Sequence, residues 1–300
     1  MNEATTHEIA SHGIAAPGKA RNGDACGHRE LADEDLVVLV VADGVSSRPS
    51  DWKASDVACE VVLSGFAQQS GSLEARLVRA VTLAHENVTV LDGEHRGAQS
   101  TLVVAVWRRG EDVVRYVNVG DSRLHEVHDG GVRALTTDDA KDIVIRRDGE
   151  VTTRDGAVGT ARGITNALGP AAPPRIVVQE APFPVGGTLA LTTDGCHGMP
   201  GFVTRMVALH GAADLASALP TELFVNWPVE DQDDATIVVL RRRRFTAALR
   251  ERATAALLAG EAPESAGVPR HMMARHVVDH MRGRLAAGDT ASLEPALAYL

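Results

Sequence analysis

Residues 36–44 read Leu36-Val-Val-Leu-Val-Val-Ala-Asp43-Gly44, an apolar run that ends in an aspartate and a glycine. The run is short and rich in branched side chains, and it is apolar at both odd and even positions. A strand with this pattern is typically covered on both faces of its sheet. We therefore expect a central strand here, with Asp43 at its end and other elements packed around it.

Helices and then strands follow this run in the sequence. Apolar residues step by three and four along Ala54–Val62 and again along Leu73–Leu91, which predicts two amphipathic helices. Three strand candidates come next, at Thr101–Trp107, Val113–Val119 and Arg123–Val127, with glycine-containing turn signals between and after them. Closely spaced strands of this kind predict an antiparallel meander.

Further strands are predicted at Arg175–Gln179, Thr188–Thr192 and Ala235–Leu240, with helices near Phe202–Leu209 and Ala212–Leu219. Strands therefore come in blocks that are separated by helices, without a repeating strand–helix–strand unit. This order predicts an α+β fold with a layered antiparallel core.

Two stretches stand apart from this pattern. Asp138–Gly163 is polar, contains several glycines and has weak periodicity, so it resembles a mobile or inserted segment whose fold the sequence does not predict. After the basic run Arg241–Arg244 the sequence becomes rich in alanine and helix formers. We expect one domain over residues 1–242 and a helical C-terminal extension over residues 243–300. The basic run itself is interpreted as a solvated strand edge, in preference to a docking patch for an acidic partner or RNA.

Composition limits the class of protein. The 300 residues carry a net charge of −10, which divides into −14 for residues 1–240 and +4 for the remainder. An acidic body with 3% aromatic residues argues against nucleic-acid binding. The three cysteines form no C-x-x-C pair, which disfavours a disulfide framework or a thiolate zinc site. With neither a leader-like N-terminus nor an apolar run of about 20 residues, we expect a cytoplasmic protein without membrane contact.

Four aspartates occur where an apolar strand gives way to a glycine or a polar turn, and Asp24 in Asn22-Gly-Asp24 is a fifth candidate. The four are Asp43, Asp121, Asp194 and Asp233. Aspartate before glycine is common turn chemistry, but a set of such positions in one chain suggests a shared role. Carboxylates about 4 Å apart repel by about 4 kcal/mol at an effective dielectric constant near 20, and a divalent cation removes that cost. All-oxygen ligands favour Mg²⁺ or Mn²⁺ over Zn²⁺, and Gly44 would let its carbonyl approach an ion closely.

In order along the chain, eight motifs resemble those of the PPM family, the type 2C metal-dependent Ser/Thr protein phosphatases. The bacterial branch is the more similar. The motifs span residues 22 to 239 and are Asn22-Gly-Asp24, Val41-Ala-Asp-Gly-Val45, Ser100-Thr-Leu-Val103, Asn118-Val-Gly-Asp-Ser-Arg123, Leu135-Thr-Thr-Asp138, Ile164-Thr-Asn-Ala-Leu-Gly169, Leu191-Thr-Thr-Asp-Gly195 and Asp233-Asp-Ala-Thr-Ile-Val-Val239.

The resemblance implies an α/β/β/α sandwich, in which two packed antiparallel sheets are flanked by helices, around a two-metal site. Asp43 would bridge both metals and Gly44 would supply a carbonyl ligand. Asp194 and Asp233 would complete the first metal site, and Asp24 would hold a metal-bound water. Asp121, together with Asp194, corresponds to a third and weaker metal site of bacterial members. Two Mn²⁺ or Mg²⁺ ions would supply a bridging hydroxide for in-line attack on phosphorus.

The sequence departs from the family pattern at three places. Gly23 stands where an acidic residue or glutamine is usual, which removes an expected ligand of the second metal. The phosphate-binding arginine falls on Lys19 by strict spacing, whereas Arg21 requires a short gap; we rank Arg21 first, because an ammonium does not replace a bidentate guanidinium fork evenly. Asp234 stands where asparagine is common and adds one more negative charge.

These observations predict a phosphatase in bacterial signalling that hydrolyses phosphoserine and phosphothreonine in proteins, with a phosphoprotein of a cognate Ser/Thr kinase as substrate. The departures motivate an alternative, a weak or inactive regulatory module of the same fold that binds a partner protein. A haloacid-dehalogenase-type phosphatase is disfavoured, because its aspartate nucleophile would stand two residues before Asp43, where Val41 is.

Overall fold

The computed structural model describes residues 5–48, 50–144, 146–147, 150–151, 160–224 and 232–244. Two five-stranded antiparallel sheets make up its centre. The first sheet contains, in spatial order, β1 (Thr5–Ile14), β14 (Ala235–Arg244), β13 (Thr188–Thr192), β6 (Arg123–His128) and β7 (Gly131–Ala134). The second contains β12 (Gln179–Pro182), β5 (Val113–Val119), β4 (Leu102–Arg108), β3 (Leu36–Asp43) and β2 (Asp24–Leu31).

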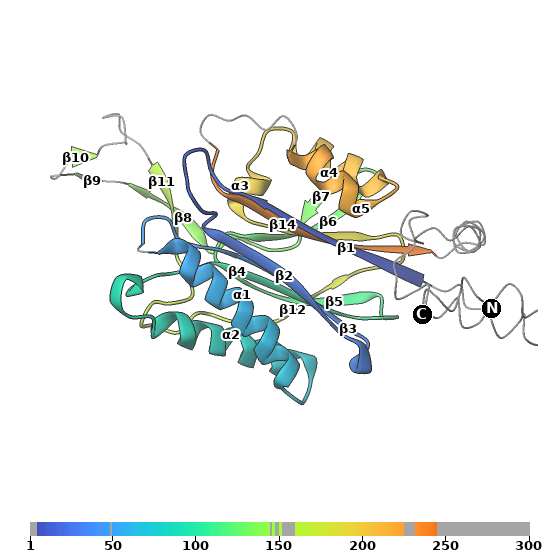
Figure 1. The fold of residues 1–300 in the computed structure, drawn as a ribbon, viewed down its shortest axis with the longest axis horizontal. Coiled ribbons are helices and arrows are strands. Elements are labelled where there is room, and N and C mark those ends of the chain that lie inside the picture. Colours follow the sequence, from blue (N-terminus) through green and yellow to red (C-terminus); the bar gives the residue numbers. More distant parts are fainter. Residues whose placement is uncertain are drawn as a thin grey trace, which may run out of the picture.

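Helices cover the outer face of each sheet, as Figure 1 shows. The second sheet is covered by α1 (Asp51–Gln68) and α2 (Leu73–Thr89). The first is covered by α3 (Asp194–His197), α4 (Phe202–Gly211), α5 (Leu215–Ala218) and the π-helical turn η3 (Leu219–Phe224). Two 3-10 turns, η1 (Ala32–Glu34) and η2 (Gly93–His95), lie in connections. The predicted α+β class and its α/β/β/α layers are confirmed.

Strand β3 lies inside the second sheet between β2 and β4, with helices on one side and the first sheet on the other. Its alternate residues Val38 and Val40 pack against α1 and α2, whereas Val37 and Leu39 pack in the core between the two sheets. All of its apolar residues are at most 1% exposed. The unbroken apolar run is therefore explained by burial on both faces, as predicted.

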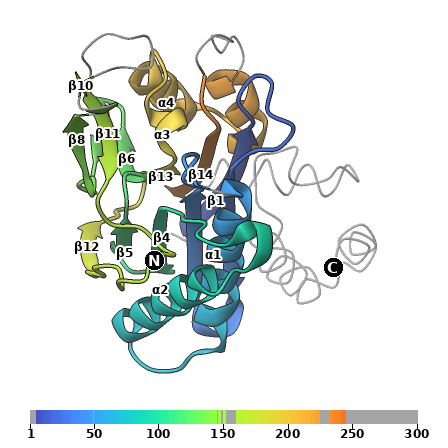
Figure 2. The same ribbon diagram turned by 90° about the vertical axis from the view of Figure 1, so that its left-hand side faces the viewer.

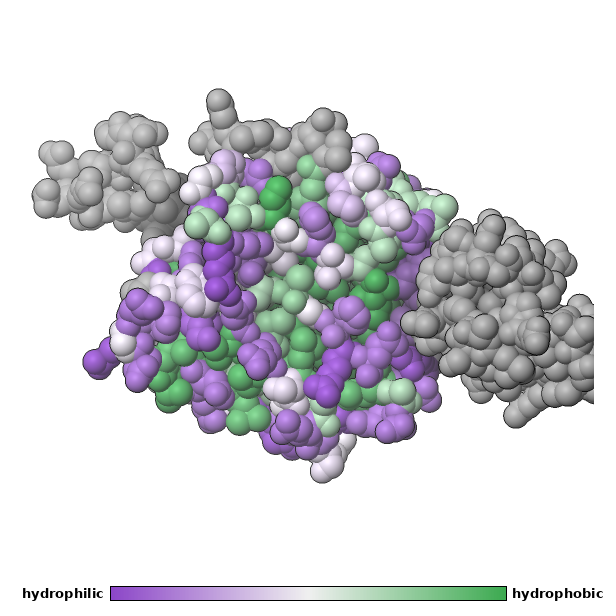
Figure 3. Space-filling model, viewed as in Figure 1, coloured by the Kyte–Doolittle hydropathy of each residue, from purple (hydrophilic) through white to green (hydrophobic). Residues whose placement is uncertain are grey.

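On the outside, hydrophilic and hydrophobic residues are interspersed over the face shown in Figure 3. Among the described residues, no helix has the length and apolar character needed to cross a membrane.

A small hairpin projects from one end of the sandwich, and Figure 2 looks onto that end. It pairs β8 (Ala140–Val144) with β11 (Thr160–Ile164), and the two-residue strands β9 (Arg146–Arg147) and β10 (Glu150–Val151) also pair. These strands form the described part of Asp138–Gly163, for which the sequence predicted no fold. The predicted helical extension, apart from the two residues 243 and 244 that belong to β14, lies outside the described residues.

The predicted strand Arg175–Gln179 is wrong in position, because β12 begins at Gln179. The amide of Arg175 donates to the side chain of Asn166 at 3.0 Å instead of to a neighbouring strand. Ile176 and Val178 pack against the core beneath α1 and α2, so their alternation reflects packing of an extended segment. The predicted helix at Ala212 begins later, at Leu215, because the side chain of Asp214 caps the amide of Ser217 at 2.9 Å.

The interpretation of Arg241–Arg244 as a solvated edge is also wrong. Strand β14 continues through these residues, and the side chains of Arg241 and Arg242 are 2% exposed. Arg241 Nε donates to Glu8 at 2.7 Å, and its Nη1 donates to the carbonyls of Leu209, His210 and Ala212. Arg242 donates to Asp112 at 2.8 Å. The side chains of Arg241 and Arg242 are thus buried polar groups at the end of a strand. Carboxylates and carbonyls accept hydrogen bonds from both, whereas Nε of Arg242 has no partner among the described residues.

Arg241→Ala should lower the free energy of unfolding by about 3–5 kcal/mol, since it leaves Glu8 and several carbonyls without their buried partner. Arg133 offers a matched control, because its side chain is 60% exposed in its pair with Glu126, and Arg133→Ala should cost less than about 1 kcal/mol. Urea unfolding of both variants measures the difference. Equal losses in the two variants would contradict the buried role of Arg241.

Candidate metal centre

Pairing of β2 with β3 places Asp24 directly opposite Asp43. Asp24 begins its strand and Asp43 ends the other, so antiparallel pairing brings the two aspartates to the same sheet end. Asp24 is 8% exposed, and its Oδ2 accepts a hydrogen bond from the hydroxyl of Thr193 at 2.8 Å. Strand register therefore brings two acidic groups together at a buried position.

The backbone of Asp43 is held by residues from the start of β4. The Asp43 amide donates to Thr101 Oγ1 at 3.1 Å, and the Thr101 amide donates to the Asp43 carbonyl at 2.8 Å. The hydroxyl of Ser100 donates to the same carbonyl at 3.0 Å. Both Ser100 and Thr101 are fully buried. The Ser-Thr pair of the third motif thus fixes the end of β3 and orients Asp43.

Asp194 approaches from the other sheet. It is the first residue of α3, directly after β13 and Thr193, and its carboxyl is hydrogen-bonded to that of Asp43. A hydrogen bond between two carboxyl groups requires a proton on one of them. Asp121 lies in the turn between β5 and β6, is 7% exposed, and its charge also acts on Asp43. Elements of both sheets therefore converge on Asp43.

The pKa values of these carboxyl groups reflect burial and mutual repulsion. Burial, with the charges of Asp24 and Asp194, raises the pKa of Asp43 well above its usual range. Burial raises the pKa of Asp24 to about 7, although the Thr193 hydroxyl opposes the shift. Asp194 is exposed when the whole residue is considered, but protein atoms surround its carboxyl group. This burial raises the pKa of Asp194 as well. Three neighbouring acids thus resist simultaneous ionisation.

The donors at this place suit a hard divalent cation. Among the described residues, no three Asp, Glu, His or Cys side chains are arranged as a complete ligand set. Mg²⁺ does not require one, because it is commonly held by one or two carboxylates with several waters. The adjoining carboxyl groups of Asp43 and Asp194 offer oxygen donors whose repulsion a cation would relieve. The residues present therefore fit Mg²⁺ or Mn²⁺.

Gly44 lies where three backbone segments meet. A Cβ atom at this position would be 2.2 Å from the carbonyl oxygen of Asp51 and 2.7 Å from that of Gly23. Gly44 also donates its amide to the Gly23 carbonyl at 3.2 Å. Any side chain at position 44 would separate β3 from the start of α1, so close packing requires glycine here.

Asp233 and Asp234 occupy different environments immediately before β14. Asp233 is exposed; its Oδ1 accepts the amide of Asp234 at 2.8 Å, and its charge acts on Asp194. Asp234 is 4% exposed and accepts the amides of Ala16 at 2.7 Å and Gly23 at 2.8 Å. Asp233 therefore lies beside Asp194, whereas Asp234 holds the loop that precedes β2.

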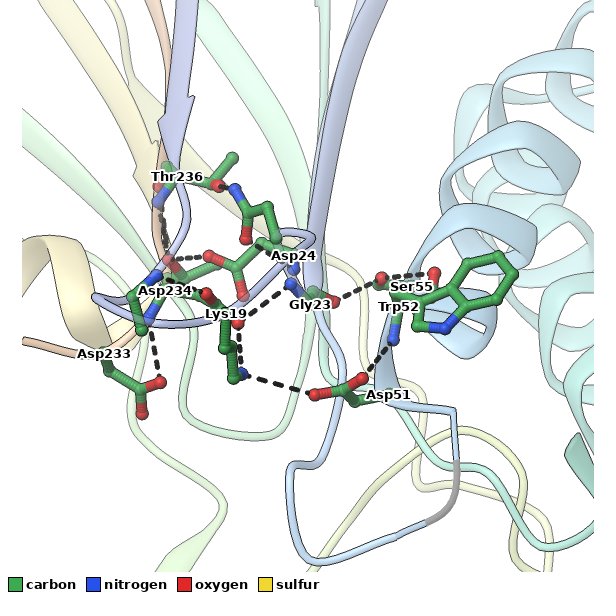
Figure 4. A network of polar contacts seen from close by, with 12 residues as sticks. Lys19, Gly23, Asp24, Asp51, Trp52, Ser55, Asp233, Asp234 and Thr236 are labelled. Atoms are coloured by element: carbon green, nitrogen blue, oxygen red, sulfur yellow. Dashed lines mark hydrogen bonds and ion pairs between the residues drawn. The ribbon is translucent and has the colours of Figure 1, made fainter.

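The structure brings Lys19 to this region, between Asp234 and Asp51, as Figure 4 shows. Lys19 Nζ lies 2.5 Å from Asp234 Oδ2 and 3.4 Å from Asp51 Oδ2. Burial alone would lower the pKa of Lys19, but the hydrogen bond and charge of Asp234, with Asp51, raise it to about 12.

The guanidinium of Arg21 lies 3.8 Å from the ring centroid of Trp52 and is paired with Asp56, with its side chain 55% exposed. Asp56 and Trp52 belong to α1, so Arg21 lies against this helix. Lys19, and not Arg21, contacts the carboxylates of Asp51 and Asp234. Which of the two basic residues binds phosphate stays a prediction.

Two residues of the site were not identified from the sequence. Thr193 donates to Asp24, and its hydroxyl accepts the amide of Thr236 at 2.9 Å, so it links three of the motifs. It lies within a recognised motif, next to Asp194, where a hydroxyl beside a carboxylate was an available signal. Asp51, at the start of α1, belongs to none of the eight motifs. Only the fold shows that it faces Gly23.

The chain matches known proteins over most of these elements. A family model described as Protein phosphatase 2C matches residues 16–223. The serine/threonine phosphatase stp of Listeria innocua is 26% identical over 187 residues, which are 59% of this chain and 73% of that protein.

Solved structures are similar as well. The PPM Ser-Thr phosphatase MsPP from Mycobacterium smegmatis, in complex with cacodylate, has a TM-score of 0.58 and 26% identity over 78% of this chain and 97% of that one. The catalytic domain of the serine threonine protein phosphatase PstP, in complex with two manganese ions, has a TM-score of 0.56 and 20% identity, and covers 80% of this chain and 100% of that one.

Replacing Asp24 by asparagine should stabilise the metal-free protein increasingly as the pH rises. The pKa of Asp24 is raised from 3.8 to about 7 on folding, so the folded state binds the proton more tightly and wild-type stability falls as pH increases through this range. The advantage of Asp24→Asn over wild type should grow by more than about 1 kcal/mol between pH 4 and pH 8. Urea unfolding with chelator present measures it; a difference that is constant with pH would contradict the assignment.

Proposed function

The chain belongs to the protein phosphatase 2C family of metal-dependent Ser/Thr phosphatases, as its motifs predict, and on that premise we propose the reaction that it performs. It hydrolyses phosphoserine and phosphothreonine in proteins, using two divalent cations, Mn²⁺ or Mg²⁺, at the Asp43 cluster. The observation that supports this most strongly is the meeting of Asp24, Asp43 and Asp194 from the ends of two sheets. Bound cations would relieve the repulsion between buried acids that lie this close together.

Each aspartate has a role in this proposal. Asp43 would hold both cations, the Gly44 carbonyl would supply a further ligand, and Asp194 with Asp233 would complete the first cation site. Bound divalent cations would lower the pKa of a water, so that hydroxide is available at neutral pH for attack on phosphorus. Asp24, whose Oδ2 already accepts the Thr193 hydroxyl, would hold that water. Asp121 with Asp194 would bind a third cation more weakly.

Lys19 is the proposed phosphate-binding group. Its ammonium is the cation that lies beside the loop of Gly23 and Asp234, and its raised pKa keeps it charged at any physiological pH. An ammonium binds phosphate as a point charge, without the bidentate geometry of arginine. Lys19 therefore attracts the substrate phosphate, while Asp51 and Asp234 position it.

The substrate is a phosphoprotein, and a cognate Ser/Thr kinase is the proposed source of it. The unit that carries the activity is the described sandwich, which ends with β14. Residues beyond it would form the separate helical extension that the sequence predicts.

A regulatory module without strong catalysis is the second candidate, since the ion pairs of Lys19 with Asp234 and Asp51 compete with phosphate binding. Such a module would keep the fold and bind a partner protein. Titration calorimetry separates the two candidates: no Mn²⁺ binding, with tight binding of a partner, would favour the regulatory module.

The wild-type protein should hydrolyse a phosphothreonine peptide when Mn²⁺ is added to chelator-treated enzyme. Asp43→Asn and Asp194→Asn should each lower kcat/KM by at least about 10²-fold, because a ligand that stabilises several kcal/mol of charge in the transition state is lost. Asp56→Asn, which changes a carboxylate paired with Arg21 on the outside of α1, serves as the control. Unchanged turnover in both ligand variants would refute the proposal.

Separate replacement of Lys19 and Arg21 by methionine tests which of the two binds phosphate. Lys19→Met should reduce kcat/KM for the same peptide by about 10²-fold, the usual effect of removing one donor to a developing oxyanion. Arg21→Met should change it by less than about threefold, because Arg21 is stacked on Trp52 away from the cluster. The reverse order of effects would return the assignment to Arg21.

A further inference from the structure

The space beside Gly23 is occupied by carboxylates from other elements. A Cβ atom on Gly23 would lie 2.8 Å from Asp234 Oδ2 and 2.9 Å from Asp51 Oδ2. Gly23 itself is buried, and the family pattern has an acidic residue or glutamine at this position. The volume into which that side chain would extend therefore already holds acidic oxygen atoms, although they come from the start of α1 and from the segment before β14.

The two carboxylates differ in how firmly they are engaged. Asp234 uses both oxygens, since Oδ1 accepts the Ala16 amide and Oδ2 accepts the Gly23 amide and the Lys19 ammonium. Asp51 uses Oδ1 for the Trp52 amide at 2.8 Å, whereas its Oδ2 contacts Lys19 at a longer distance of 3.4 Å. The side chain of Asp51 is 22% exposed, compared with 4% for Asp234. Asp51 Oδ2 is thus the more available oxygen.

Asp51 is also fixed close to Gly44. Ser55 Oγ lies 2.6 Å from the Gly23 carbonyl oxygen, to which its hydroxyl donates, and 3.0 Å from the Trp52 carbonyl oxygen. These contacts fasten the first turn of α1 to the loop before β2. The Asp51 carbonyl lies within 2.2 Å of where a Gly44 Cβ would be. The backbone at position 51 is therefore packed against the residue that follows β3, and the Asp51 carboxylate lies beside Gly23.

We propose that Asp51 provides the second divalent cation with the carboxylate oxygen that position 23 lacks. The inference rests on the proposed function, because it assigns a residue to a cation site of that function. Oxygen ligation by Asp51, with Asp43 and the Gly44 carbonyl, matches the preference of Mg²⁺ and Mn²⁺ for carboxylate and carbonyl oxygens. Lys19, which contacts Asp51 only at 3.4 Å, would then keep its ion pair with Asp234 and face the phosphate.

Calorimetric titration of the chelator-treated, full-length protein with Mn²⁺ tests the proposal without relying on turnover. The wild type should bind two ions, and Asp51→Asn should bind one, or bind the second at least about 10-fold more weakly. Asparagine keeps the Oδ1 acceptor for Trp52, and Asp51→Ser provides a second uncharged replacement in case the amide perturbs the fold. Thermal unfolding of each metal-free variant checks that the chain is folded.

Asp56→Asn is the matched control, since Asp56 also lies on α1 but pairs with Arg21; it should retain both ions at wild-type affinity. Two ions bound with wild-type affinity by Asp51→Asn and Asp51→Ser would overturn the assignment of Asp51. A wild type that binds one ion would also overturn it, and would indicate that the Lys19 ammonium takes the place of the second cation. A wild type that binds no ion would instead refute the proposed function.

Discussion

Repulsion between carboxyl groups at the ends of strands is the constraint on which this structure depends. Asp24 and Asp43 are partners across β2 and β3, and Asp194 reaches Asp43 from the other sheet. Each ionised pair at contact distance costs several kcal/mol even at an effective dielectric constant of 20. Packing elsewhere must supply that free energy. Buried apolar layers on both sides of β3 and β4 provide it, since each face of the second sheet packs against either helices or the first sheet.

The hydrogen bonds around the cluster determine which acids can move. Ser100 and Thr101 fix the backbone at Asp43, and Thr193 joins Asp24 to the segment between β13 and Asp194. These hydroxyl groups are fully buried, so their bonds are protected from exchange with water. Asp233 is exposed and bonded mainly to the next amide. Two buried acids at the ends of strands thus lie beside a more accessible one.

Periodicity predicted the elements that have a regular buried face. The strands β3 to β6, the helices α1 and α2 and the strand β13 all lie close to their predicted residue ranges, because core packing imposes a regular apolar pattern. The predicted meander is wrong, because β4 and β5 pair in the second sheet whereas β6 belongs to the first. Edge elements gave no such pattern: β1 pairs only with β14, and few of its residues need to be apolar. The aspartates could be identified because each of them lies within a short motif of neighbouring residues. The positions of Arg241 and Asp51 depend on partners distant in sequence, which no local pattern contains.

The unusual residues near Gly23 are best understood as one set. Loss of a side chain at position 23 removes a negative charge and opens a volume, and the Asp51 and Asp234 carboxylates fill that volume. Two added negative charges require a cation, and a compact ammonium can bind both from a single atom, whereas a guanidinium would spread its donors over a wider plane. Lys19 meets that need and has a raised pKa as a result. The two departures from the family pattern at positions 19 and 23 are therefore connected. Glycine at position 23 leaves room for the Asp51 and Asp234 carboxylates, and Lys19 forms ion pairs with both.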